Sequence, residues 1–110
     1  MPSRLEMLDK LIARGSNDPF VHYARAMELR GQGDGEQALA AFEQVRERFP
    51  AYVPTYLMGG QLAAELGASE RAREFLEKGI AAAKTAGDDH ALSELAAALA
   101  TLPAPGEGPD

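Results

Sequence analysis

Apolar residues recur along the chain at spacings of three and four positions, and regular alternation of apolar and polar residues is absent. This spacing is the period of an α-helix rather than that of a strand. We therefore expect an all-α protein of about six helices. The apolar runs place these helices at about 3–15, from 19 onward, and at about 35–48, 54–66, 69–86 and 89–102.

Residues that favour helix ends stand at the boundaries of these runs. Ser3 followed by Glu6 fits a capping box, and Asp18 before Pro19 fits an N-cap with proline in the first turn. Gly87 follows the fifth run, where a glycine commonly ends a helix. These signals predict that the helices are short and joined by tight turns.

The glycine-rich stretch 31–38, which reads GQGDGEQA, has two possible interpretations. A phosphate-binding loop follows a strand and opens a helix with its glycines. This stretch instead follows a predicted helix. Gly33 stands where that helix should end, and Asp34 stands where the next should be capped. We therefore predict a turn between helices rather than a phosphate site.

The chain resembles itself when it is shifted by 34 residues. Glycines, glutamates, alanines and large apolar residues then coincide, which indicates an internal repeat of one helix pair. The coinciding pairs include Gly33 with Gly67, Glu36 with Glu70, Ala38 with Ala72 and Phe42 with Leu76.

A helix pair of this length with these residues resembles the tetratricopeptide repeat. The positions that carry the resemblance are Ala26, Leu29, Ala38, Phe42, Val45 and Pro50 in the first repeat, and Tyr56, Gly60, Ala72, Leu76 and Gly79 in the second. The departures from the family pattern are His22, Arg25, Gly59, Ala63 and Lys84. The resemblance implies antiparallel helix pairs in a short right-handed solenoid, as in small stand-alone bacterial proteins of this family, many without an assigned function.

The repeat predicts the domain organisation. We expect a single domain over residues 1–102, with a leading helix (3–15), a first repeat (19–52), a second repeat (53–87) and a closing helix (88–102). Residues 103–110 are rich in proline and glycine and are expected to be a disordered tail.

The family resemblance also implies a binding site. Tetratricopeptide repeats bind a peptide or a helix on a concave face lined by the first helix of each repeat. The matching residues here are Phe20, Tyr23, Met27, Arg30, Leu57, Gln61 and Ala64, to which the closing helix would add Ala91, Leu95 and Ala98. Alternatively, the leading or closing helix covers this face, which would make Phe20 and Tyr23 core residues.

The family's clamp for a C-terminal carboxylate is not expected in this chain. That clamp uses lysine and asparagine side chains, and the matching positions cannot supply them. These positions are Tyr23, Met27, Met58, Asp88 and Leu92.

A second function remains open. Residues 91–102, ALSELAAALATL, could form an exposed end face through which the chain self-associates as a homodimer. The other interpretation of the same segment is a simple closing helix.

We expect no enzymatic activity, metal or cofactor. His22 and His90 both occupy a position for large packing residues in the repeat, and about two helix pairs would separate them, so we expect packing rather than a shared ion. No pair of carboxylates and no Ser–His–Asp arrangement can be argued from the sequence.

Composition narrows the partners and the compartment. The formal net charge is −6, and the basic residues are scattered among acidic ones, so we expect neither nucleic acid nor an anionic membrane as a partner. The chain has no cysteine, no secretory signal pattern and no apolar run long enough to span a membrane. We therefore expect a cytoplasmic protein whose partner is an unknown protein or peptide.

Overall fold

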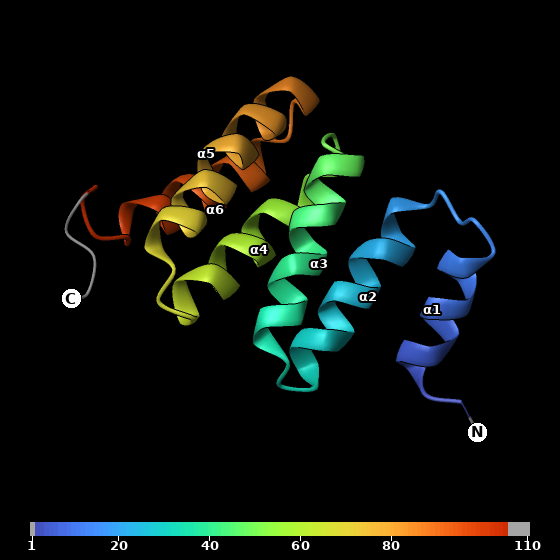
Figure 1. Cartoon of the computed structure of the whole chain (residues 1–110). Helices are drawn as coiled ribbons and strands as arrows, with labels where there is room; N and C mark the ends of the chain where they lie inside the picture. Colours follow the sequence, from blue (N-terminus) through green and yellow to red (C-terminus); the bar gives the residue numbers. More distant parts are fainter. Residues whose placement is uncertain (1, 106–110) are drawn as a thin grey trace. The chain divides into compact units, whose positions relative to one another are not determined.

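The computed structural model describes residues 2–105, and within this range the regular elements are six α-helices without a strand. The helices are coloured in chain order in Figure 1. Their bounds are α1 Arg4–Ala13, α2 Pro19–Gly31, α3 Gly35–Arg48, α4 Pro54–Glu65, α5 Ser69–Ala86 and α6 Asp89–Ala100. The predicted all-α class is confirmed.

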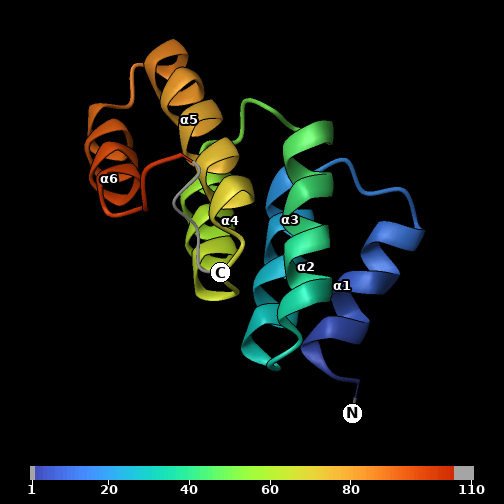
Figure 2. The same cartoon turned by 60° about the vertical axis from the view of Figure 1, so that its left-hand side comes forward.

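The chain divides into two units, Met1–Phe49 with helices α1 to α3 and Pro50–Asp110 with helices α4 to α6. In the first unit, α2 packs against both α1 and α3. In the second unit, α5 packs against both α4 and α6, and α4 also touches α6. Figure 2 shows the three helices of each unit from a second direction. The single domain over residues 1–102 stays a prediction.

The local signals for helix ends act as predicted. The Asp18 carboxylate accepts a hydrogen bond from the Phe20 N–H, and the Asp34 carboxylate accepts one from the Gln37 N–H. The predicted helix limits differ slightly: α1 ends at Ala13 rather than near Gly15, and α4 ends at Glu65.

The glycine-rich stretch is a turn, as expected. Gly33 has a φ of +81°, a left-handed conformation that favours glycine, and the N–H of Asp34 donates to the carbonyl of Leu29. Gly67 and Ala68 form the same arrangement one repeat later, with the Ala68 N–H on the Ala63 carbonyl. The stretch 31–38 therefore ends α2 and begins α3, without a preceding strand.

The core of the first unit lies between α2 and α3. The small residues Ala26 and Ala38 are fully buried, and so is the ring of Phe42. Leu29 is also buried, as the repeat pattern implies. Leu39 is fully buried too, although the repeat comparison does not single it out.

The core of the second unit depends on glycines that let helices approach closely. A Cβ on Gly60 would lie 2.6 Å from the Leu76 side chain, and a Cβ on Gly79 would lie 2.4 Å from the Cβ of Tyr56. Tyr56, Ala72 and Leu76 are buried, as the repeat pattern implies. The glycines therefore set the spacing between α4 and α5.

Two sequence-based expectations about α6 are wrong. His90 was expected to pack, but its side chain is 87% exposed, and its Nε2 lies 2.9 Å from a carboxylate oxygen of Glu94. No helix follows α6 up to residue 105, so nothing in this range packs on that position. Leu95 was expected on the binding face, but it is buried because it fills the space over Gly79.

The predicted tail lies largely outside the described residues. Residues 103–105 are exposed, and the Arg73 guanidinium donates a hydrogen bond to the carbonyl of Pro103. The disorder expected for 106–110 falls beyond the described range.

Candidate protein-interaction faces

The four predicted binding residues of the first unit all lie on α2. The cap at Asp18 and the proline at position 19 begin this helix, so that Phe20 stands in its first turn. Phe20 is 54% exposed, whereas Tyr23, Met27 and Arg30 are half-buried. The Tyr23 ring meets the Phe42 ring edge-on, with 6.1 Å between centroids. The α2 face thus has an exposed aromatic end and a more enclosed remainder.

These burial values bear on the alternative in which the face is covered. Phe20 is not a core residue, since more than half of its surface is accessible. Tyr23 is intermediate, because one edge packs on the core ring of Phe42 and part of the side chain is accessible.

The second unit holds a hollow of about 420 Å³ between α4 and α6. Leu57 and Gln61, both predicted binding residues, form the α4 side of this hollow. The other lining residues come from α6 and the residue after it: Glu94, Ala97, Ala98 and Thr101. Ala98 had been expected on this face.

The arrangement of α4 to α6 explains why the hollow exists. Leu95 holds α6 against the bare backbone at Gly79, and the neighbouring residues Ala97 and Ala98 have small side chains. The hollow therefore has an apolar base of Leu57 and alanine methyl groups, with Gln61 and Glu94 as polar edges. Such a mixture suits the apolar face of a peptide whose flanks carry hydrogen-bonding groups.

Ala64 is exposed on α4 and does not line this hollow. The predicted site residues thus fall into two groups, the α2 face in the first unit and the α4–α6 hollow with Ala64 in the second. That the two groups form one concave face stays a prediction.

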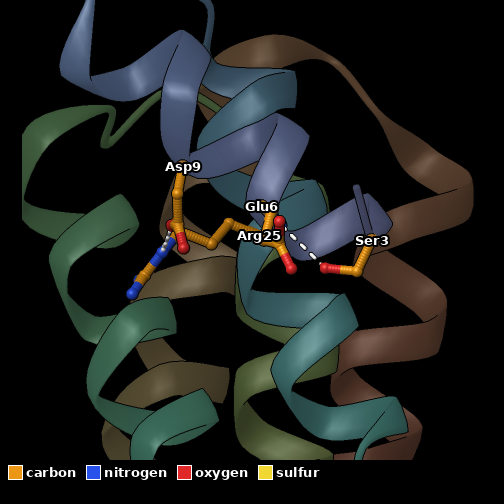
Figure 3. A network of polar contacts seen from close by, with 4 residues as sticks. All are labelled: Ser3, Glu6, Asp9 and Arg25. Atoms are coloured by element: carbon orange, nitrogen blue, oxygen red, sulfur yellow. Dashed lines mark hydrogen bonds and ion pairs between the residues drawn. The ribbon is translucent and has the colours of Figure 1, made fainter. Parts of the chain in front are cut away.

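The first unit holds a second hollow, of about 470 Å³, that was not predicted from the sequence. It is lined by Asp9 and Ile12 of α1, His22 and Arg25 of α2, and Ala41, Gln44, Val45 and Arg48 of α3. Figure 3 shows the ion pair at its side, where Arg25 reaches across from α2 to Asp9 on α1. The signal was available, because His22 and Arg25 are the two departures of the first repeat from the family pattern.

Two features are absent from the described residues, a metal-binding cluster and a membrane-spanning helix. Within residues 2–105, no group of three or more histidine, aspartate and glutamate side chains is close enough to hold a metal ion. None of the six helices in this range has the length and apolar character needed to cross a membrane.

Comparison with known proteins agrees with the repeat. The sequence profile of the tetratricopeptide repeat family matches residues 29–100, which is more than half of the chain. A tetratricopeptide repeat-containing protein of Pseudomonas aeruginosa is 28% identical over 98 residues, which cover 89% of this chain and 93% of that protein.

Solved structures give the same result. The solution structure of a tetratricopeptide repeat domain protein from Salinibacter ruber has a TM-score of 0.72 and 37% identity, covering 76% of this chain and 85% of that one. A protein from Bordetella parapertussis, at 23% identity, shares the fold with a TM-score of 0.75 over 91% of this chain and 87% of its own.

These matches rest on the same helix pairs that the internal repeat predicts. Tetratricopeptide repeats are generally protein-interaction modules without catalytic activity. The small residues at the helix crossings, the buried large residues between them and the family match over residues 29–100 lead to one conclusion: this chain belongs to the tetratricopeptide repeat family.

Proposed function

We propose that this chain is a non-enzymatic adaptor that binds a peptide or a helix of a partner protein. The partner's apolar side chains enter the α4–α6 hollow of the second unit, and the α2 face of the first unit supplies a further contact. The observation that carries the proposal is the hollow of about 420 Å³ that includes Leu57 and Gln61.

The chemistry of both faces supports this function. Leu57 is half-buried and Gln61 exposed, so the hollow offers apolar surface beside an accessible amide. Phe20 is exposed on α2, and exposed aromatic side chains are enriched at interfaces. We also propose a cytoplasmic location, which follows from the composition rather than from the fold.

A matched pair of substitutions on α6 tests the proposal. Ala97 lines the hollow and its neighbour Ala96 does not, yet both are exposed. We expect Ala97→Arg to fill the hollow and to lower the affinity for the partner by about tenfold or more, since truncating or blocking an interface anchor costs over about 1 kcal/mol. We expect Ala96→Arg to bind like the wild type.

The measurement has two steps. A pull-down from a lysate of the source organism, with the full chain as bait, identifies the partner, and calorimetric titration then measures its affinity for each variant. A double variant, Tyr23→Ala with Arg30→Glu, probes the α2 face, with circular dichroism as the test of folding. Equal affinities for Ala97→Arg and Ala96→Arg would contradict the role of the hollow.

Self-association through α6 is the second candidate function. Leu95 is the one residue of α6 that is buried, while Leu92 and Leu99 are half-buried and Ala96, Ala97 and Ala100 are exposed. A second copy could cover this apolar surface. Light scattering over a range of concentrations decides the matter, because a stable homodimer has twice the monomer mass and a monomeric adaptor does not.

A further inference from the structure

The first unit contains a second hollow, separate from the faces discussed above. It is the hollow of about 470 Å³ bounded by α1, α2 and α3, and it shares no residue with the proposed peptide-binding face. Its volume lies within the range of sites that take a small ligand or one or two side chains. This inference does not depend on the proposed function.

The residues that line the hollow carry a net positive charge, although the chain as a whole is acidic. The chain has a formal net charge of −6, but the hollow is lined by two guanidinium groups, Arg25 and Arg48, against the single carboxylate of Asp9. Gln44 adds an amide that can donate and accept. The local charge therefore favours an anionic group, and the fork of an arginine matches a carboxylate in shape.

Both arginines are held in place by contacts within the first unit. The Nε of Arg25 lies 2.6 Å from an Asp9 carboxylate oxygen, and a terminal nitrogen of Arg48 donates to the side-chain oxygen of Asn17. The Arg25 side chain is 31% exposed and its terminal nitrogens extend beyond Asp9 in Figure 3. A guanidinium has five N–H donors, so each arginine can take a ligand without losing its anchor.

The remaining walls combine a fixed ring with apolar side chains. His22 Nε2 lies 2.8 Å from the Ser16 carbonyl oxygen, which can only accept, so this nitrogen carries the proton. The ring also packs on Phe49, with 5.1 Å between centroids. Ile12 is half-buried and supplies accessible apolar surface, whereas Ala41 and Val45 are buried core residues that border the hollow. An anionic group attached to an aliphatic body matches this lining.

We propose that this hollow binds the side-chain carboxylate of an acidic residue in a partner peptide, with a neighbouring aliphatic side chain against Ile12. Arg25 and Arg48 hold the carboxylate. The negative charge of Asp9 offsets part of the charge of Arg25 and thereby limits the affinity.

The test uses the full chain, labelled with nitrogen-15, and two blocked tripeptides. One has glutamate between two leucines, and the other has glutamine in its place. We expect the glutamate peptide to shift the amide resonances around Arg25 and Arg48, with an affinity about tenfold above that of the glutamine peptide, since charge-assisted hydrogen bonds are about twice as strong as neutral ones.

Three substitutions separate binding from folding. We expect Arg25→Gln and Arg48→Gln each to weaken binding by about tenfold, while Arg14→Gln, an exposed arginine outside the hollow, leaves it unchanged. We expect Asp9→Asn to strengthen binding severalfold, because it removes the negative charge beside Arg25 without changing the shape of the side chain. A purely structural ion pair would not give this gain.

Other outcomes would overturn the proposal. Equal shifts with the glutamate and glutamine peptides, or shifts that map to α4 and α6, would remove the carboxylate site. Sodium acetate that binds as tightly as the glutamate peptide would show that free organic acids, rather than peptides, are the ligand. Weaker binding by Asp9→Asn would show that Asp9 supports the site instead of limiting its affinity.

Discussion

The two units place different residues at equivalent repeat positions, and one pair of positions shows what such a difference does. Gly59 and Phe75 in the second unit correspond to Arg25 and Ala41 in the first, 34 residues earlier. Phe75 is fully buried, and a Cβ on Gly59 would lie 2.5 Å from its ring. In the first unit, Arg25 and Ala41 instead line a hollow of about 470 Å³.

This difference shows how a repeat can hold its backbone and change its chemistry. In the second unit a large ring over a glycine fills the space between helices. In the first unit the small side chain of Ala41 leaves that space open, and the charged side chain of Arg25 borders it. The absence of a side chain at Gly59 thus makes room for the Phe75 ring, whereas Arg25 lines a hollow.

The largest expected effect is in the close packing of the second unit. Gly79→Ala would place a Cβ 2.4 Å from the Cβ of Tyr56 and 2.9 Å from Leu95. Overpacking of this kind costs about 3 kcal/mol, which exceeds the gain in helix propensity of about 1 kcal/mol. We expect a clear loss of stability in urea unfolding followed by circular dichroism.

Gly31→Ala is the matched control, because Gly31 is also helical but nothing lies within 4 Å of its added Cβ. We expect it to stabilise the first unit by about 0.5–1 kcal/mol. If both substitutions had the same effect, the close approach at Gly79 would not determine the stability of the second unit.

A smaller effect is expected at the start of α5. Asp34 and Ala68 have nearly the same backbone conformation, with φ −93° and ψ 72° at Asp34 and φ −93° and ψ 69° at Ala68. Asp34 caps its helix with its side chain, and Ala68 cannot. We expect Ala68→Asp to stabilise the protein by about 1 kcal/mol in the same assay. Ala68→Leu, which offers no acceptor, should give no such gain.

The smallest effect on stability is expected at Arg25. Arg25→Leu removes a partly exposed ion pair, worth at most about 1 kcal/mol, and adds apolar surface to the hollow. We therefore expect a change within about 0.5 kcal/mol in urea unfolding, together with loss of carboxylate binding. A loss above about 2 kcal/mol would mean that Arg25 holds α1 and α2 together.

The sequence predicts the helices well because their ends are specified locally. Asp18, Asp34 and Asp88 each cap the helix that follows, and Gly87 has the left-handed conformation that ends α5. Each of these signals acts within about one turn of helix and needs no knowledge of distant contacts. The repeat then predicts which small residues are buried between helices.

The core residues Leu39 and Phe75 were not predicted, because residues of a different type stand at the equivalent positions of the other repeat. At a shift of 34 residues, Leu39 corresponds to Arg73 and Phe75 to Ala41. A comparison that looks for similar residues therefore does not identify these two. His90 was misassigned because no helix follows α6 up to residue 105, and Leu95 was misassigned because it packs over Gly79. The polar hollow escaped prediction for a related reason, since it needs residues from three helices.

Gly79 also has a consequence for the way the chain could be divided. Because Gly79 has no side chain, Tyr56 and Leu95 both pack close to its backbone. Leu95 is the single buried residue of α6. The junction at Gly87 and Asp88, just before α6, lies between Gly79 and Leu95 in the sequence. A chain that ends there would leave the space over Gly79 unfilled. A separate helix with a leucine at the equivalent position could pack in that space, so α6 is suited to be supplied as a separate peptide in split or chimeric versions of this protein.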